Sequence, residues 1–580
     1  MTACRRGSPK PRRSSKSEVG AKAVNPGAML RWAHMRARAV EASMVGAVAL
    51  LLTVVMTWPI APRILSAGRT DSGDGRYSVW NVAWVAHALV ADPLHVYDAN
   101  IFYPHRRTLT YSEPNIGAGA IAIPFYWLGG KNPHFTHNAV QLLSFVLAMA
   151  GMYALVKRLS GARAGAAVAA VSFAFCPFIF SHLTHIQLLM TAGIPFALLA
   201  MHRYIERPGA GRGVALGLIL AAQALSCGYY GIYAGLLVGY GCLFYGFTRG
   251  LWRSPRYWLG VVAAAAVAVA VVAPFFLPYI DLNRETGFER SIDDARRWAA
   301  DWHSYLVSSA WGHTWLLPYV RPWAEVLYPG TAAIVLGLIG LLGLRRKAAP
   351  PAGRDHIVFY ASVVAIAFWA SFGPDAGLYR WFYDTIPVFS WLRAPARFGL
   401  VCVLGLGVLG GFAVARWTAA SRRGLVLGAV LVLLALTDLW VGPLELTEPR
   451  PVDPAHTALA RLPKGAVAEF PFFHLREDFH RHTEFMLFST AHWQPMLNGY
   501  SDNIPDDFRE MAPQMDRFPD ARSFAAMQAR GVRYLLVHMD YYGDGVEMKQ
   551  NLSRYAAYLR PLHAKDPVWL YEIAAWPPSH

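Results

Sequence analysis

Residues 257–277 read YWLGVVAAAAVAVAVVAPFFL, a stretch without a single charged side chain. A helix of about 20 such residues crosses the hydrocarbon core of a bilayer. Because lipid offers no hydrogen bonds to the backbone, a chain that crosses it as a single segment must be helical. The stretch therefore predicts a membrane-spanning helix.

Other apolar stretches approach the same length. They lie at residues 42–60, 138–155, 164–180, 186–201, 213–226, 230–247, 326–344, 357–372, 399–415 and 425–441. The whole chain agrees with this pattern, since 55% of its residues are hydrophobic and only 16% are charged. Water-soluble domains are considerably more polar. We predict a polytopic α-helical membrane protein with roughly 11 transmembrane helices.

The basic residues fall in alternate connectors between these stretches, and positive connectors stay on the cytoplasmic side. The pattern requires that residues 117–128, which are short and contain Pro124, form a re-entrant or interfacial segment. We then expect a multi-pass protein of the bacterial inner (cytoplasmic) membrane, with a cytoplasmic N-terminus and an extracytoplasmic C-terminus. Topology accounts for the net charge of +17, so we expect no nucleic-acid partner. The residues concerned are Lys157, Arg158, Arg163, Arg203, Arg207, Arg212, Arg249, Arg253, Arg256, Arg345, Arg346, Lys347, Arg416, Arg422 and Arg423.

Three parts follow from this topology. We expect a disordered basic cytoplasmic tail at residues 1–41, a transmembrane domain at 42–442 with outward loops 61–137 and 278–325, and an extracytoplasmic soluble α/β domain at 443–580. In the last part the apolar runs shorten and Gly, Pro and Asp turn residues appear. Its predicted strands lie at 466–473, 532–538 and 568–573, and a helix is predicted at 521–530.

The first outward loop carries acids close to the membrane surface. Asp71 and Asp74 follow the first apolar stretch, and Arg76, His105, Arg106 and Glu113 come later in the loop. A partly desolvated carboxylate at that depth can deprotonate a hydroxyl group. The same residues also fit an ordinary polar turn, because Asp and Gly are common turn residues.

Residues 77–89 of this loop place Trp80, Trp84 and Leu89 at helical spacing. That spacing predicts an amphipathic helix lying in the membrane interface.

Arg393 and Arg397 lie four residues apart at the outer end of the apolar stretch 399–415. On a helix they can face one way, and arginine binds phosphate through paired hydrogen bonds. Arginines at helix ends also hold lipid head groups without any catalytic role. Both interpretations stay open.

Asp301 and His303 of the second outward loop are flanked by Trp302 and Tyr305. Acids, bases and aromatic rings in such proximity are typical of sugar sites, but also of solvated loops.

His182 and His185 lie at the outer mouth of two spans, and their spacing alone is weak evidence for zinc. No set of metal ligands stands out, although a divalent cation could contribute. Walker, dinucleotide-binding and Gly-x-Ser-x-Gly motifs are absent from the sequence, which argues against an ATP-driven pump, a nicotinamide enzyme and an α/β-hydrolase.

Taken together, these features resemble the integral-membrane glycosyltransferases of the GT-C fold, especially uncharacterised bacterial envelope members and the YfhO-like group. The resemblance covers most of the chain. It is carried by Asp71 and Asp74, by the loop from Phe102-Tyr103-Pro104 to Glu113, by the turn from Ser181-His182-Leu183 to Gln187, by Leu392-Arg393-Ala394-Pro395-Ala396-Arg397-Phe398, and by Asn498-Gly499-Tyr500-Ser501.

The resemblance implies transfer of a sugar from a polyprenyl-phosphate carrier to an envelope glycan, lipid or protein on the outer face. Asp71 or Asp74 would then be the base, and Arg393 and Arg397 would hold the carrier phosphate. Arg76, His105, Arg106, Glu113, Asp301 and His303 would line the substrate site. The better-characterised members have adjacent acids in the first loop, whereas Ser72 and Gly73 separate them here.

Two other functions fit the sequence. A lipid or glycan transporter or flippase would carry ionisable residues in mid-membrane and internal repeats, and few such charges and no clear repeat are present. A non-enzymatic envelope assembly protein would use its external domain to bind partners.

Overall fold

The computed structural model describes Thr2, Gly7 and residues 26–287, 290–321, 324–345, 353–418 and 422–578. Two compact units are formed by Met1–Val48 and Ala49–His580. Helix α1 (Pro26–Met56) begins well before the first predicted span. The expected disordered tail at 1–41 is therefore wrong for residues 26–41, and nearly all of its remainder lies outside the described residues. Arg346 and Lys347 also lie outside them.

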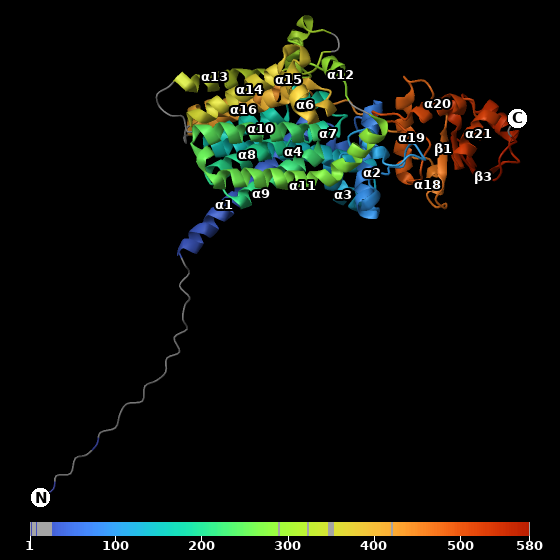
Figure 1. The fold of residues 1–580 in the computed structure, drawn as a ribbon, viewed down its shortest axis with the longest axis horizontal. Helices are drawn as coiled ribbons and strands as arrows, with labels where there is room; N and C mark the ends of the chain where they lie inside the picture. Colours follow the sequence, from blue (N-terminus) through green and yellow to red (C-terminus); the bar gives the residue numbers. More distant parts are fainter. Residues whose placement is uncertain are drawn as a thin grey trace. The chain divides into compact units, whose positions relative to one another are not determined.

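The larger unit contains a body of long helices that run side by side (Figure 1). Each predicted apolar stretch coincides with a helix or with two short consecutive helices. Those beyond α1 are α4 (Pro133–Ser160), α5 (Arg163–Ala174), α6 (Pro177–Ser181), α7 (Ile186–Leu189), α8 (Gly193–Glu206), α9 (Ala210–Ser226), α10 (Gly228–Thr248), α11 (Pro255–Thr286), α13 (Thr331–Leu341), α14 (Arg354–Ser371), α16 (Gly399–Trp417) and α17 (Arg422–Asp438).

Within the described residues, seven helices are long and apolar enough to cross a membrane by length and composition. The chain is thus a helical membrane protein, but the predicted count of eleven spans is not confirmed. The difference lies in the shorter helices: α9 and α13, for example, have 17 and 11 residues. About 20 residues are needed for a full crossing.

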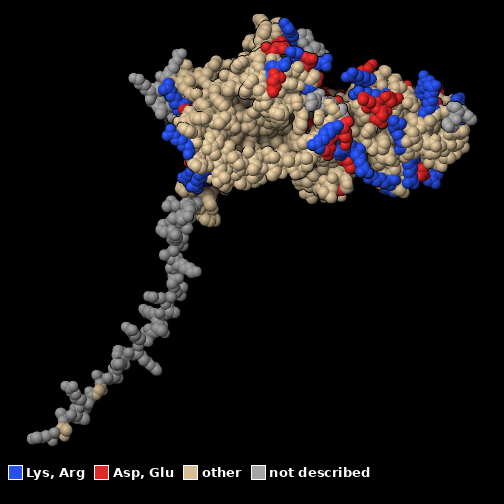
Figure 2. All heavy atoms as spheres, viewed as in Figure 1, with Lys and Arg blue, Asp and Glu red and all other residues tan. Residues whose placement is uncertain are grey.

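Figure 2 shows that charge is unevenly distributed over the visible face. Lys and Arg gather at the left end of the helical body, whose middle is nearly uncharged, while both signs mix around the C-terminal segment. Some of the basic connectors are held by acids, as Arg158 is by Glu206 and Arg249 by Asp355. The side of the membrane that each end faces remains a prediction.

The first outward loop folds into α2 (Gly73–Ala91) and α3 (Ile116–Leu128). The predicted helix at 77–89 is present, but Trp80 and Trp84 are buried against protein and do not form an exposed amphipathic face. Trp80 is 0% exposed and donates its indole N–H to Asn100 Oδ1 at 3.2 Å. Trp84 donates to the carbonyl of Val96 at 2.9 Å. Helix α2 packs against α3, α4 and α19 (His482–Phe488).

The second outward loop contains α12 (Ile292–Arg297), and α15 (Leu378–Thr385) precedes the Arg393 segment.

The C-terminal segment forms a four-stranded sheet flanked by short helices. The strands are β1 (Ala466–Phe470), β2 (Val532–His538), β3 (Leu559–Lys565) and β4 (Val568–Ile573), in the order β1-β2-β4-β3. Strands β1 and β2 are parallel, and the other neighbours are antiparallel. The helices are α18 (Pro454–Leu459), α19, α20 (Asp506–Met515), α21 (Ala521–Ala529) and α22 (Val546–Ser553).

All three predicted strands and the predicted helix at 521–530 are confirmed in this segment. Strand β3 was missed because its sequence, LRPLHAK, contains a proline and several polar residues and lies mostly exposed at the sheet edge.

Backbone hydrogen bonds join the C-terminal segment to the first outward loop. Gly68 and Thr447 exchange two hydrogen bonds, of 3.2 and 2.9 Å. The N–H of Met496 donates to the carbonyl of Asn100 at 2.8 Å, and the N–H of Asn503 donates to that of Tyr111 at 3.0 Å. Buried side chains from both segments also share one hydrophobic cluster. The C-terminal segment can therefore position residues beside α2.

Candidate active site

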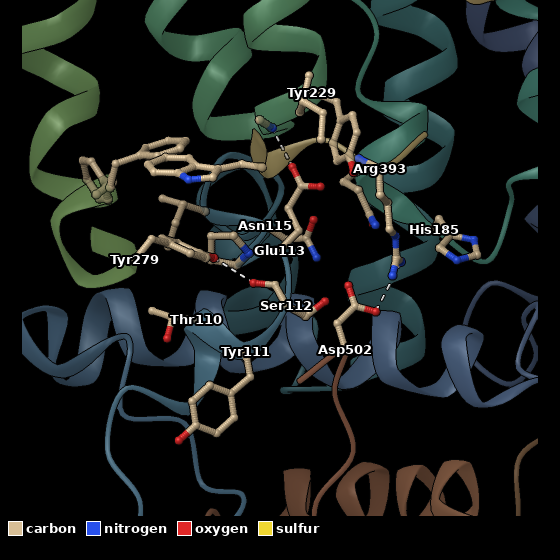
Figure 3. A pocket seen from close by; sticks show the side chains of 18 of the residues that line it. Thr110, Tyr111, Ser112, Glu113, Asn115, His185, Tyr229, Tyr279, Arg393 and Asp502 are labelled. Atoms are coloured by element: carbon tan, nitrogen blue, oxygen red, sulfur yellow. Dashed lines mark hydrogen bonds and ion pairs between the residues drawn. The ribbon is translucent and has the colours of Figure 1, made fainter. Parts of the chain in front are cut away.

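A pocket of about 270 Å³ lies where α2, the loop before α3, the starts of α7 and α10, α11 and the Arg393 segment meet. Figure 3 shows that its labelled side chains come from both the helical body and the C-terminal segment. The polar groups that matter most are Asp74, Glu113, His185, Arg290, Arg393, Arg397 and Asp502.

Asp74 occupies the first turn of α2. Ser72 caps this helix, since its hydroxyl accepts a hydrogen bond from the N–H of Gly75 at 3.2 Å. Glycine is required at position 75, because a Cβ there would lie 1.9 Å from the carbonyl oxygen of Arg69. The close packing of Gly75 against Arg69 thus fixes the backbone at the start of α2. A carboxylate in this first turn is stabilised by the helix dipole. The Ser-Gly-Asp-Gly sequence therefore aims one acid into the pocket.

His185 is the nearest partner of Asp74. Its Nε2 lies 3.5 Å from Oδ2 of Asp74, and its Nδ1 lies 3.0 Å from the hydroxyl of Thr184. The hydrogen bond from His185 holds the pKa of Asp74 below its ordinary value, and the charge of Arg393 and the Tyr500 hydroxyl act in the same direction, whereas burial opposes them. Asp74 is therefore ionised at neutral pH.

Glu113 is the second carboxylate of the pocket. Its Oε1 accepts a hydrogen bond from the N–H of Gly228 at 2.6 Å, at the start of α10. Burial raises the pKa of Glu113, although the Gly228 N–H and the charge of Arg397 oppose this effect. The two carboxylates thus have pKa values that are shifted in opposite directions, a difference that enzymes use to separate roles.

Arg393 lines the same pocket, and its side chain extends towards Asp502 (Figure 3). Its Nη2 lies 3.3 Å from Oδ1 of Asp502, whose other oxygen lies 3.5 Å from Nη2 of Arg290. The backbone N–H of Arg393 donates to the hydroxyl of Tyr229 at 3.0 Å. One exposed carboxylate thus orients two guanidinium groups at the pocket wall.

Arg397 is held differently. Its guanidinium carbon lies 4.1 Å from the centre of the Tyr229 ring, a cation–π contact. Among the described residues, no carboxylate lies within ion-pair distance of Arg397. Its charge can therefore be offered to an anion in the pocket.

The pocket also has an apolar and aromatic side. Leu225, Ile232, Phe275, Phe276 and Trp391 line it. All of these except Trp391 lie on α9, α10 and α11 of the helical body, so the pocket combines an apolar wall with its charged groups.

Several predicted site residues lie outside the pocket lining. Asp71 is exposed, 3.3 Å from the guanidinium of Arg69. Arg76 donates to Thr483 and to the carbonyl of Thr70. His105 contacts Asp507 at 2.8 Å, and Arg106 is exposed.

Asp301 and His303 are likewise outside it. Asp301 accepts a hydrogen bond from the N–H of Ser304 at 2.8 Å, and the ring of His303 stacks on Trp302. These contacts shape the second outward loop locally. Of the predicted residues, the structure brings together Asp74, Glu113, Arg393 and Arg397.

Asp502, Arg290 and Tyr229 were not identified from the sequence. Asp502 directly follows the Asn498-Gly499-Tyr500-Ser501 motif, which was the available signal. Arg290 and Tyr229 carry no motif of their own. Among the described residues, one group of three metal-type ligands has its donor atoms within 4.8 Å of one another, and it belongs to the C-terminal segment rather than to the pocket.

The structure thus combines a body of membrane-type helices with a charged pocket formed largely by the segments that connect them. Residues 116–275 match the family model described as dolichyl-phosphate-mannose-protein mannosyltransferase. The structure is similar to that of the arabinofuranosyltransferase AftD from Mycobacteria, with a TM-score of 0.52 and 14% identity. A mutant of AftD gives a TM-score of 0.51 and 15% identity, over 92% of this chain and 41% of that one. These findings confirm the predicted GT-C resemblance.

The alignment with AftD covers 93% of this chain but only 40% of AftD. The archaeal oligosaccharyltransferase AglB from Archaeoglobus fulgidus aligns less well, with a TM-score of 0.42 and 12% identity over 93% of this chain and 75% of that one. The fold assignment therefore relies on AftD. No curated protein is significantly similar to the chain in sequence.

Proposed function

We propose that the chain is a membrane glycosyltransferase that moves a sugar from a polyprenyl-phosphate carrier to an envelope acceptor on the outer face of the cytoplasmic membrane. The observation that carries this proposal is the convergence of Asp74 and Glu113 with Arg393 and Arg397 on one pocket. Acids facing guanidinium groups suit a reaction in which a hydroxyl loses a proton and a phosphate departs.

Asp74 is the base in this proposal. As the acceptor oxygen attacks the anomeric carbon, its proton passes to the Asp74 carboxylate and the bond between that carbon and the phosphate oxygen breaks. The electron pair leaves on the phosphate, where Arg393 and Arg397 stabilise the added charge. Asp74 is preferred over Asp71 because Asp71 does not line the pocket.

Glu113 is proposed to bind the sugar. One of its oxygens is already occupied by the Gly228 N–H, which leaves the other for a sugar hydroxyl. His185 keeps Asp74 oriented, and Asp502 keeps Arg393 and Arg290 oriented. The apolar residues of the pocket would contact the first prenyl units of the carrier.

The test is release of polyprenyl phosphate by the purified full-length chain in detergent, from a panel of synthetic polyprenyl-phosphate sugars. The Asp74→Asn variant should lose at least about a hundredfold in rate, the scale of general-base catalysis. Asp71→Asn is the matched control from the same loop and should retain activity. Equal release by the wild type and Asp74→Asn would refute the assignment of the base, and no release from any donor would refute the activity.

A further inference from the structure

A cluster of buried polar side chains lies in the C-terminal segment. His456 comes from α18, Glu469 from β1 and His538 from the end of β2. Their side chains are 0%, 0% and 3% exposed. None of the three lines the pocket described above.

The geometry of the cluster is compact. Nε2 of His456 lies 2.9 Å and Nε2 of His538 lies 2.6 Å from the same oxygen, Oε1 of Glu469. One ligand-type atom from each residue lies within 4.8 Å of the other two. Bonds of about 2.0–2.1 Å to a tetrahedral zinc ion place neighbouring donor atoms roughly 3.3 Å apart. Small side-chain rotations would therefore open the cluster to an ion.

Hydrogen bonds alone leave the cluster incomplete. Oε2 of Glu469 and Nδ1 of His456 are buried without any hydrogen-bond partner. Burying a carboxylate oxygen without a hydrogen-bond partner costs free energy, because its hydrogen bonds to water are lost and are not replaced. Both imidazoles contact the same oxygen of Glu469, and the other oxygen has no hydrogen-bond partner. A cation bound between the three side chains would coordinate these donor atoms.

We propose that His456, Glu469 and His538 form a structural site for a divalent transition-metal ion of the zinc type. The donor set of two imidazoles and one carboxylate is one that zinc prefers. Oε2 of Glu469 is available as a fourth donor.

The ion would join α18, β1 and β2. Next to these elements, Asn498 bonds both backbone groups of Glu469, at 2.9 and 2.8 Å. Asn498 begins the turn that leads to Tyr500 and Asp502. The metal would thus stabilise the part of the sheet from which this turn departs.

The experiment uses the full-length chain, purified in detergent with a histidine-free affinity tag and no chelator. Elemental analysis should find about one zinc per chain, as expected of a closed site. Glu469→Gln and His538→Gln should contain little zinc. His563→Gln, on β3 of the same sheet, is the matched control and should hold as much zinc as the wild type.

Two measurements on the wild type do not depend on the folding of a variant. Chelator treatment should lower the thermal unfolding midpoint, and zinc should restore it. Cobalt(II) added to the chelator-treated chain should give the visible absorption bands of a tetrahedral site. A wild type that contains no zinc and takes up neither zinc nor cobalt would overturn the proposal, as would variants that retain as much metal as His563→Gln.

Discussion

Nε2 of His185 lies 3.5 Å from Oδ2 of Asp74, so a turn between two membrane helices supports the acid of the first outward loop. The contact lowers the pKa of Asp74. Replacing His185 with alanine should raise the pKa of Asp74 and move the acid limb of the pH–rate profile to higher pH. The limb reports the group that must be ionised for the reaction.

The profile should be measured as release of polyprenyl phosphate at a saturating donor concentration. His182→Ala is the control, since His182 lies three residues away and does not line the pocket. An unchanged acid limb in His185→Ala would show that another group controls it.

The guanidinium groups should act mainly on the phosphate. A charge-assisted hydrogen bond contributes about 1.5–3 kcal/mol, so Arg393→Ala and Arg397→Ala should each lower kcat/KM roughly 10- to 150-fold. Lysine at either position keeps the charge but not the paired donors, and should recover only part of this loss. Arg106→Ala, an exposed residue outside the pocket, should match the wild type. Equal loss in Arg106→Ala would point to a general effect of surface charge.

Glu113→Gln should separate stability from activity. Burial raises the pKa of Glu113 in the folded chain, so the unfolded chain loses this proton at a lower pH than the folded chain and gains stability relative to it. The resulting loss of folding stability is absent below the unfolded pKa, grows as pH rises from the unfolded pKa to the folded pKa, and is constant above the folded pKa. Glutamine resembles the neutral acid and can keep the Gly228 hydrogen bond.

The Glu113→Gln variant should therefore unfold at a higher temperature than the wild type at pH 8, and the difference should shrink towards about pH 4, near the ordinary glutamate pKa. Its transferase rate should fall. Thermal unfolding of both chains across this range is the measurement, and a variant less stable than the wild type at high pH would contradict it.

Gly75→Ala tests the close turn before Asp74. The new Cβ would lie 1.9 Å from the carbonyl oxygen of Arg69, so we expect a loss of about 1–3 kcal/mol and lower activity. Gly211→Ala is the matched control, because Gly211 also lies near the start of a helix and has nothing within 4 Å of the added atom. It should be neutral or slightly stabilising. Thermal unfolding of both variants would reveal whether the turn tolerates a methyl group.

The helical body could be predicted from the sequence, because a long apolar segment that crosses lipid must satisfy its backbone hydrogen bonds internally and is therefore helical. Strands β1, β2 and β4 were also predictable from their buried apolar residues. Strand β3 was not, since an exposed edge strand needs no apolar pattern.

The pocket was predicted in part. Asp74 and Arg393 were grouped through the resemblance to GT-C glycosyltransferases, and in the structure both line one pocket. Asp301 and His303 lie in the second outward loop, but they contact Ser304 and Trp302 of the same loop and do not line the pocket. Spacing along a loop does not determine its path, and the contribution of Asp502 depends on pairing between segments far apart in sequence.

That pairing has a consequence for biosynthesis. Asp74 leaves the ribosome near the beginning of translation, whereas Asp502, which orients Arg393, emerges only after every membrane helix has been made. A nascent chain still being inserted therefore lacks a complete pocket, because Asp502 is one of the residues that line it.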